Sequence, residues 1–334
     1  MIKRFAFSAV ALFCTMMTGA QNNDVVSAVL QTGDETKMYM GVEALIKAYN
    51  DAAETGSVIT LSGGSFNSPG NIKKSVSIYG NCFEANTINN TQATTINGDI
   101  LFSTGNDETS LENIRLEGFH LTGNILVNQI KNLIIDKCEF STLRINGNYA
   151  EEISVRRCYL NGLNSLSSDY KIVGLDFQNC FITGRITHGN EENQILVDHC
   201  ILAHYGDYGH EKALYRNCII RLGGWRSDIA AGATIKNNIF SVGSVSASIQ
   251  EGNWFSVSND NIFDPEDGTD FSYSAERTFK LKTPNDFVGT DNTEVGINGG
   301  NYPWNKIPRM PVVKSLKLDV EGKQLNVTYE AEVR

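Results

Sequence analysis

Five copies of one short pattern occupy the middle of the chain: LIIDKCEF (133–140), ISVRRCYL (153–160), LDFQNCFI (175–182), ILVDHCIL (195–202) and ALYRNCII (213–220). Their cysteines are separated by 20, 22, 20 and 18 residues. Two further copies, IRLEGFHL (114–121) and ATIKNNIF (233–240), carry Phe119 and Asn238 in the cysteine position. A repeat of this period indicates a solenoid, in which one short unit stacks on the next.

Two kinds of solenoid use a unit of this length. A leucine-rich repeat follows the pattern L-x-x-L-x-L-x-x-N/C-x-L, and residues 130–140 (IKNLIIDKCEF) fit it. A parallel β-helix has looser units with several strands in each. We favour the β-helix because the spacing varies between 18 and 22 residues, leucine does not dominate, and a second short strand regularly follows a turn glycine. No proline lies between Pro69 and Pro265, as expected for strands that are paired on both sides.

The repeated cysteines are predicted to be buried thiols. Apolar and polar residues alternate in IDKCEF (135–140), so Cys138 should point into the interior with Ile135 and Phe140. An even number of cysteines in an exported chain normally suggests disulfides, but a free cysteine packs as a small apolar residue. Because stacked strands lie about 4.8 Å apart, a bridge between neighbouring coils stays an alternative.

The first twenty residues have the features of a secretory signal peptide. Lys3 and Arg4 precede the apolar run 5–17, and small residues follow, with cleavage expected near Ala20. We therefore expect a secreted, periplasmic or cell-surface protein, with no membrane span in the mature chain. Without Lys3 and Arg4, 26 basic and 38 acidic side chains remain, a net charge of −12. This charge disfavours nucleic acid and anionic lipid as partners.

The chain divides into four predicted parts: a signal peptide (1–20), an N-terminal cap (21–56), a parallel β-helix (57–300) and a C-terminal tail (301–334). Apolar residues at helical spacing predict a helix over 41–53 in the cap. The tail alternates apolar and polar residues around 321–323, which predicts a β-hairpin. We expect the hairpin to cover the open edge of the last coil, or alternatively to attach the protein to a surface or partner.

Both ends of the predicted solenoid resemble known sequences. Residues 42–80 resemble the opening of secreted bacterial β-helix proteins of the pectate-lyase-like superfold, with Ser57 and Phe66 replacing an acidic residue and a tyrosine. Residues 286–312 resemble their closing G-x-D-x-T-D-x-G-x-x-G-G-x-Y-P-W segment from Gram-negative bacteria, with Glu294 replacing the second aspartate. The resemblance implies export and an all-β fold, a right-handed parallel β-helix of about ten coils. It implies no particular activity, since fold does not imply function.

Enzymes of this superfold place their chemistry on outward positions of one stacked sheet. Lyases use carboxylates that hold Ca²⁺ and an arginine or lysine base, and related hydrolases use a pair of carboxylates. The position two before each cysteine forms a charged column that we expect to face solvent: Glu117, Asp136, Arg156, Gln178, Asp198, Arg216 and Lys236.

Arg156 and Arg216 in this column are candidate catalytic residues, beside Asp136 and Asp198. The alternative is a ladder of opposite charges that only stabilises the strands, by about 0.2–1 kcal/mol per pair. The column has no cluster of carboxylates that suits Ca²⁺. We therefore expect no cofactor, unless the protein is a Ca²⁺-dependent lyase.

A second candidate site is a cluster of aromatic and polar residues in three successive units. Aromatic rings beside polar groups suit sugar binding, because the ring face takes C–H groups and the polar groups take hydroxyls. The candidate substrate-binding residues are His188, His204, Tyr205, Asp207, Tyr208, His210, Trp225 and Arg226. His210 is also a weak catalytic candidate. No metal site is expected, because no zinc-binding spacing occurs, and the alternative is an ordinary solvated turn with packed aromatic residues.

Together these features predict an exported, monomeric protein that binds polysaccharide without a recognisable catalytic set. One alternative is a polysaccharide lyase or glycoside hydrolase with an atypical active site. Another is a structural or adhesive surface protein, since a β-helix is stiff and extended.

Overall fold

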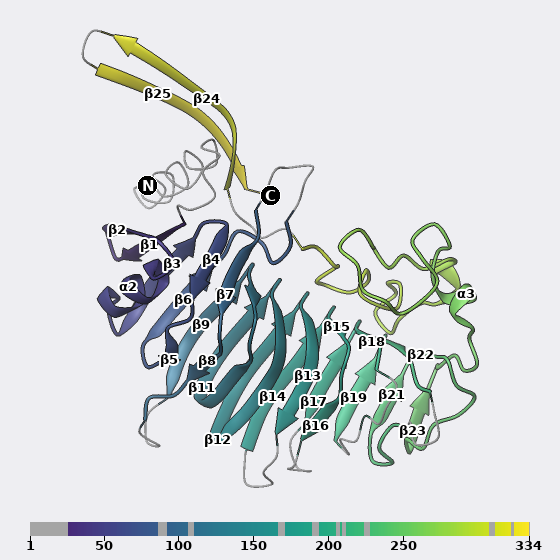
Figure 1. The fold of residues 1–334 in the computed structure, drawn as a ribbon. Helices are drawn as coiled ribbons and strands as arrows, with labels where there is room; N and C mark the ends of the chain where they lie inside the picture. The colour runs from purple at the N-terminus through teal and green to yellow at the C-terminus, as the bar shows by residue number, and fades with distance from the viewer. Residues whose placement is uncertain are drawn as a thin grey trace.

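The computed structural model describes residues 26–85, 92–105, 110–165, 171–188, 194–204, 208, 212–223, 228–306, 311–321 and 324–333. They form an all-β, right-handed parallel solenoid (Figure 1). The solenoid has about eight turns, fewer than the ten expected. The predicted signal peptide lies outside the described residues, within which no helix is long and apolar enough to cross a membrane.

The first sheet carries the charged column. Its strands run parallel from β3 onward, while β1 and β2 add antiparallel at the N-terminal end. In order, the strands are β2 (Glu35–Met40), β1 (Ser27–Thr32), β3 (Thr55–Leu61), β6 (Ser75–Tyr79), β9 (Leu111–Glu117), β11 (Ile125–Asp136), β12 (Glu139–Arg156), β14 (Lys171–Gln178), β17 (Ile195–Asp198), β19 (Ala213–Arg216), β21 (Thr234–Lys236) and β23 (Ile249–Glu251).

Two further parallel sheets complete the coils, and the long strands β11 and β12 bend at the corners to serve more than one sheet. The second sheet contains β4 (Gly64–Asn67), β7 (Thr94–Asn97), β10 (His120–Leu121), part of β12, part of β13 (Tyr159–Ser165), β15 (Phe181–Ile182), β18 (Ile201–Leu202), β20 (Ile219–Ile220) and β22 (Ile239–Phe240). The third sheet contains β5 (Gly70–Ile72), β8 (Ile100–Phe102), parts of β11, β12 and β13, and β16 (Ile186–His188).

The repeated cysteines lie in the interior, as predicted. All six cysteines in the described part of the chain are buried and free, so none of them forms a disulfide. Three of the ladder thiols, those of Cys158, Cys200 and Cys218, also accept a hydrogen bond from the backbone of the preceding coil. The N–H groups of Cys138, Cys180 and Cys200 each donate to the Sγ atom one coil further on, at 3.4 Å.

The ends differ from the simple capped solenoid that the sequence suggested. A helix, α2 (Ala44–Asp51), occupies part of the predicted 41–53 segment, and Ala44, Leu45 and Ala48 are buried in the core. The tail forms an antiparallel pair, β24 (Pro311–Glu321) with β25 (Gln324–Val333). In Figure 1 this hairpin extends away from β23 and the last coil, so it does not cover the open edge there.

The outer face of the second sheet is covered instead by residues 252–306, which we call the return segment. It begins at the last coil with α3 (Asn259–Ile262), includes η2 (Pro284–Asp286), and passes back over β22, β18 and β15 (Figure 1). The sequence-based range of the β-helix, 57–300, includes most of this segment, which adds only isolated bridges.

An apolar cluster holds the return segment in place. Outward residues of the second sheet are apolar only in the later coils, whereas the earlier His120 and Glu139 are polar and half-buried. The cluster joins Phe181, Ile201, Ile219 and Ile239 of the sheet to Ile262, Phe263, Phe271, Phe279, Leu281, Phe287, Val295 and Ile297 of the segment.

Candidate functional site

The outward side chains of the first sheet form two columns in register. The charged column is aligned as predicted, since Arg156 pairs with Asp136 and Gln178, and Asp198 pairs with Gln178 and Arg216. A strand alternates its side chains between faces, so a second outward column lies two residues earlier. This neighbouring column contains Arg115, Ile134, Ser154, Asp176, Leu196, Leu214 and Thr234.

The first residues of the charged column are buried, which corrects the expectation that the whole column faces solvent. Asp136 is 1% exposed and Glu117 is 3% exposed. Arg115 covers both of them, with its Nε 2.7 Å from Glu117 and its terminal nitrogen 2.6 Å from Asp136. Arg157 also binds both oxygens of Asp136. The salt-bridge partners of Asp136 are thus Arg115 and Arg157, and this end of the column is structural.

The middle of the face carries a continuous chain of polar contacts. Arg156 donates from Nε to the Ser154 hydroxyl at 2.7 Å, and Ser154 donates to the Asp176 carboxylate at 2.7 Å. Gln178 donates to the same carboxylate oxygen at 2.7 Å. Burial raises the pKa of Asp176, although these hydrogen bonds and Arg156 oppose the shift. Half-buried carboxyl, amide and guanidinium groups therefore lie on adjacent strands here, joined through the buried hydroxyl of Ser154.

The later rungs are paired ions. Arg216 lies 2.8 Å from Asp198, and Lys236 lies 2.9 Å from Glu251. The hydrogen bond from Arg216 to Asp198 raises the pKa of this guanidinium. A lyase base must release its proton before it can accept another, so this pairing disfavours Arg216 in that role.

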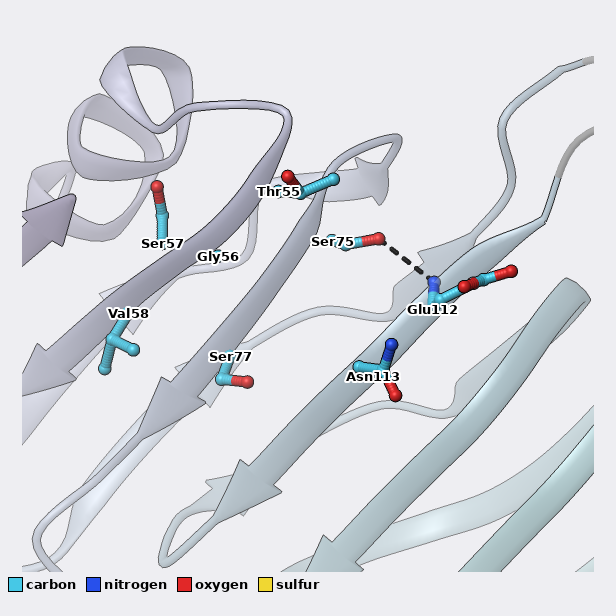
Figure 2. A pocket seen from close by; sticks show the side chains of 8 residues that line it. All are labelled: Thr55, Gly56, Ser57, Val58, Ser75, Ser77, Glu112 and Asn113. Carbon is cyan, nitrogen blue, oxygen red and sulfur yellow. Dashed lines mark hydrogen bonds between the residues drawn. The ribbon is translucent and has the colours of Figure 1, made fainter. Parts of the chain in front are cut away.

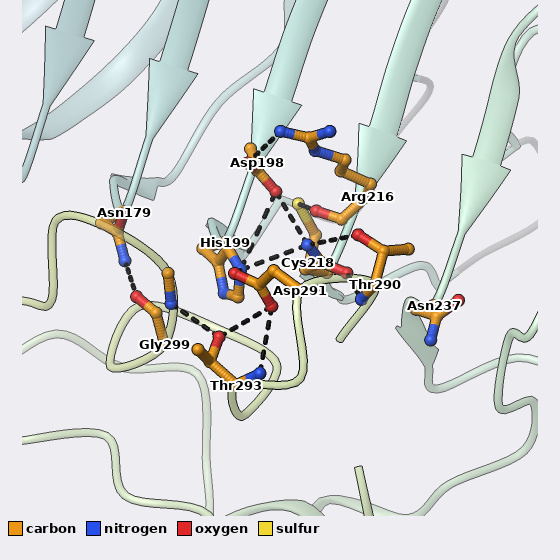
Figure 3. A network of polar contacts seen from close by, with 12 residues as sticks. Asn179, Asp198, His199, Arg216, Cys218, Asn237, Thr290, Asp291, Thr293 and Gly299 are labelled. Atoms are coloured by element: carbon orange, nitrogen blue, oxygen red, sulfur yellow. Dashed lines mark hydrogen bonds and ion pairs between the residues drawn. The ribbon is translucent and has the colours of Figure 1, made fainter. Parts of the chain in front are cut away.

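A corner with unusual backbone geometry follows the charged column. In six coils the residue just before the cysteine position has a positive φ of 48–56°. These residues are Lys137, Arg157, Asn179, His199, Asn217 and Asn237. This left-handed conformation favours asparagine among residues with a side chain. From Asn179 onward, the corner side chains bind the return segment (Figure 3).

The return segment is anchored coil by coil at this corner. Asn237 donates from Nδ2 to the Val288 carbonyl at 2.9 Å. Asn217 accepts from the Thr290 N–H at 2.8 Å. Asn179 donates to the Ile297 and Gly299 carbonyls at 2.9 and 2.7 Å. We call these contacts, together with those of His199, the clasp.

His199 lies at the centre of the clasp and is 2% exposed (Figure 3). Its Nδ1 is 3.2 Å from the Gly296 carbonyl, and its Nε2 is 3.1 Å from the Asp291 carboxylate. Burial alone would raise the pKa of Asp291, but hydrogen bonds from Thr293 and the charge of His199 hold it below its usual value. A hydrogen bond from Nε2 to the carboxylate requires a proton on that nitrogen.

Three glycines of the closing motif have a steric role in the clasp. A Cβ atom on Gly299 or Gly300 would lie 2.8 or 2.7 Å from the His199 ring. On Gly296 it would lie 2.7 Å from the Ile219 Cδ1 atom, at a φ of +89°. The backbone can approach the corner this closely only because these residues have no side chain.

The N-terminal end of the first sheet has a shallow polar hollow of about 360 Å³ between β3, β6 and β9 (Figure 2). It is lined by Thr55, Gly56, Ser57, Val58, Ser75, Ser77, Glu112 and Asn113. The hydroxyls of Ser75 and Ser77 accept the N–H groups of Glu112 and Arg115, each at 3.0 Å. Strands β6 and β9 pair directly only from Ile78 onward. Before that point the Ser75 and Ser77 hydroxyls join the two strands, and together with Glu112 they make the surface polar here.

The sequence-predicted aromatic patch is only partly within the described residues. Tyr205, Asp207, His210, Trp225 and Arg226 lie outside them, and His188 is described as the last residue of β16. His204 is half-buried and accepts a hydrogen bond from Arg185 at 3.4 Å. Tyr208 is fully buried and packs edge-on against Tyr215, with ring centroids 6.1 Å apart. Tyr208 therefore belongs to the core, where it has no exposed surface for a substrate.

Of the three candidate catalytic residues, Arg156 and Arg216 lie in the same charged column of the first sheet but three strands apart, and His210 lies outside the described residues. Within the described residues, no group of three or more His, Cys, Asp or Glu side chains could hold a metal ion. Comparisons with protein-family models, with curated proteins and with solved structures found no match to this chain.

Proposed function

We propose that this chain is an exported protein that binds a polysaccharide along the outer face of its first sheet. The observation that carries the proposal is the charged column, which places a hydrogen-bonding side chain on each strand from Arg156 to Lys236, with Asp176 beside it in the neighbouring column. Strands stack about 4.8 Å apart, so donors and acceptors recur at a short, regular interval. A polymer with regularly repeated hydroxyls matches such a face better than a compact small molecule does. Residues 1–20 support export through their signal-peptide pattern.

Binding can be tested with matched arginine variants on one strand. Arg156 lies on the proposed face, whereas Arg144 lies on the same strand, β12, in the third sheet and is exposed. The mature protein should bind at least one polysaccharide on a glycan array. Arg156→Ala should weaken that binding and Arg144→Ala should not. Absence of binding by the unaltered protein, or equal losses in the two variants, would count against the proposal.

A glycoside hydrolase is the second candidate, and one observation favours it. A hydrolytic acid needs a raised pKa, which burial gives to Asp176. Asp198, the nearest carboxylate of the charged column, lies one strand further along and would have to act as its partner. Release of reducing sugar that disappears in Asp176→Asn, with binding intact, would favour hydrolysis over binding alone.

A further inference from the structure

The clasp brings an aromatic residue of the return segment to the proposed binding face. Tyr302 follows Gly299, which Asn179 anchors, by three residues. Its ring centre lies 4.4 Å from the Arg156 Cζ atom and 5.7 Å from the Arg157 Cζ atom. Arg156 is thus stacked on Tyr302 while its Nε binds Ser154. The chain of polar contacts on the face therefore continues from Asp176 through Ser154 and Arg156 to the Tyr302 ring.

Tyr302 is not needed to fill the core. It is half-buried, and its hydroxyl makes no hydrogen bond to any residue in the described part of the chain. By contrast, Tyr273 of the same segment donates to Glu84 at 2.5 Å and stacks on Tyr159 at 4.1 Å, as a structural aromatic residue does. Tyr302 keeps a polar end and part of a large apolar ring available at the edge of the face.

We propose that Tyr302 is a sugar-binding residue, and that the docked return segment completes the polysaccharide-binding face. The inference rests on the proposed function of the first sheet. The ring supplies an apolar surface for the C–H groups of a pyranose, while the half-buried Arg156, Asp176 and Gln178 supply partners for its hydroxyls. Binding then requires the clasp, because an undocked segment would leave Arg156 without the ring.

The expected ligand class is neutral polysaccharide. The cations of the face are already paired or stacked: Arg115 and Arg157 with Asp136, Arg216 with Asp198, Lys236 with Glu251, and Arg156 with Tyr302. No excess of positive charge is therefore available for uronic acids, and the net charge of the chain, −10, repels them further.

The test is affinity electrophoresis in native gels that contain one soluble polysaccharide each. Xyloglucan, galactomannan and mixed-linkage β-glucan serve as neutral probes, and polygalacturonate and alginate serve as acidic probes. At least one neutral probe should retard the unaltered protein. Tyr302→Ala should bind that probe about tenfold more weakly, which is typical of truncating an aromatic residue central to binding. Tyr302→Phe should stay within about twofold, because the ring is kept.

A second variant tests the dependence on docking without replacing any side chain of the face. A Cβ on Gly299 would lie 1.8 Å from the Glu294 carbonyl oxygen, so Gly299→Ala should release the segment. Hydrogen exchange of residues 288–300 should then be faster in Gly299→Ala than in the unaltered protein, and unchanged in Tyr302→Ala. Gly299→Ala should lose binding as Tyr302→Ala does.

The outcomes separate the two proposals. Retardation of the unaltered protein with no loss in Tyr302→Ala overturns the role of Tyr302 and leaves the proposed function standing. Retained binding in Gly299→Ala with fast exchange overturns the requirement for docking. Retardation by acidic probes alone overturns the ligand class. Failure of all five polysaccharides to retard the unaltered protein overturns the proposed function, and this inference with it.

Discussion

The backbone N–H of Cys218 donates to the Oδ1 atom of Asn238, one coil further on, at 2.9 Å. Asn238 itself donates from its N–H to Asn253 at 2.9 Å, which ends the ladder. In the earlier coils a cysteine Sγ is the acceptor for the equivalent N–H. Cysteine and asparagine therefore perform the same task at this position: each accepts an inward N–H that the sheet ladders do not use.

This equivalence predicts the order of stability for two variants at Cys218. Cys218→Ala removes the acceptor for the Cys200 N–H and should lower the free energy of unfolding by about 1–3 kcal/mol, the cost of a buried unpaired donor. Cys218→Asn should lower the free energy of unfolding by less, because its amide oxygen can accept the Cys200 N–H in place of the thiol. Urea unfolding under reducing conditions measures both values.

Cys82 provides the control, since it is a buried thiol outside the ladder whose Sγ contacts the Gln92 carbonyl at 3.6 Å. Cys82→Ala should show only the smaller cost of lost packing. A Cys218→Ala protein no less stable than Cys82→Ala would argue against the acceptor role.

The buried ion pair at the start of the charged column should matter more than the exposed pair further along. The side chains of Arg157 and Asp136 are 8% and 1% exposed, so Arg157→Met leaves a buried carboxylate with Arg115 alone. We expect the free energy of unfolding to fall by about 3 kcal/mol. Arg216→Met should cost less than about 1 kcal/mol, because Arg216 is 39% exposed.

The Asp136→Asn change in the Arg157→Met background should restore part of the lost stability, because it removes the unpaired charge. Chemical denaturation of the four proteins provides the comparison. An unchanged or lower stability of the double variant would contradict this assignment.

Acid should weaken the clasp through Asp291. The folded protein holds the pKa of Asp291 below its usual value of 3.8, so ionised Asp291 stabilises the fold above that value. This contribution is lost as the pH falls through the lower folded-state pKa. The effect should stay below about 1 kcal/mol, because the side chain is 39% exposed. The stability difference between the unaltered protein and Asp291→Asn should shrink from about pH 6 to about pH 3, and a constant difference would be inconsistent with this linkage.

Asp176 should change the stability of the protein with pH in the opposite direction from Asp291. Burial raises its pKa, so the ionised carboxylate opposes folding at neutral pH and this cost disappears in acid. Asp176→Asn can still accept the hydrogen bonds from Ser154 and Gln178 and should therefore stabilise the protein near pH 7. Unfolding midpoints measured across the pH range should converge at low pH. A variant less stable than the unaltered protein at neutral pH would rule out this account.

The sequence predicted the repeating part of the fold well, because burial in a solenoid follows a local pattern. The inward direction of Cys138 and the register of Arg156 with its neighbours follow from alternation along each strand. The return segment could not be predicted in this way, since it has no period and its partners are more than 90 residues away, as in His199 with Asp291. One signal was present: the dipeptides Asn179-Cys180 and Asn217-Cys218 place the residue that best tolerates a positive φ just before the cysteine.

The candidate site was predicted only in part. Arg156 was identified from its place in the column, but its partners Ser154 and Tyr302 were not, because they depend on the neighbouring column and on the docked segment. Tyr208 looked like a surface aromatic residue between two glycines, yet its ring packs in the core against Tyr215. A single sequence gives no periodic signal in such a loop, so the direction of the ring could not be deduced.

The return segment also bears on the kinetics of the protein. A solenoid without it has only nearest-neighbour contacts, and its terminal coils can open one at a time. Contacts such as Asn179 with Gly299 and Lys306 with Glu84, separated by 120 and 222 residues, form only once the coils are stacked. They should therefore be absent from the folding transition state, so that changes in the clasp accelerate unfolding and leave the folding rate nearly unchanged. The segment thus acts as a kinetic lock on the finished solenoid.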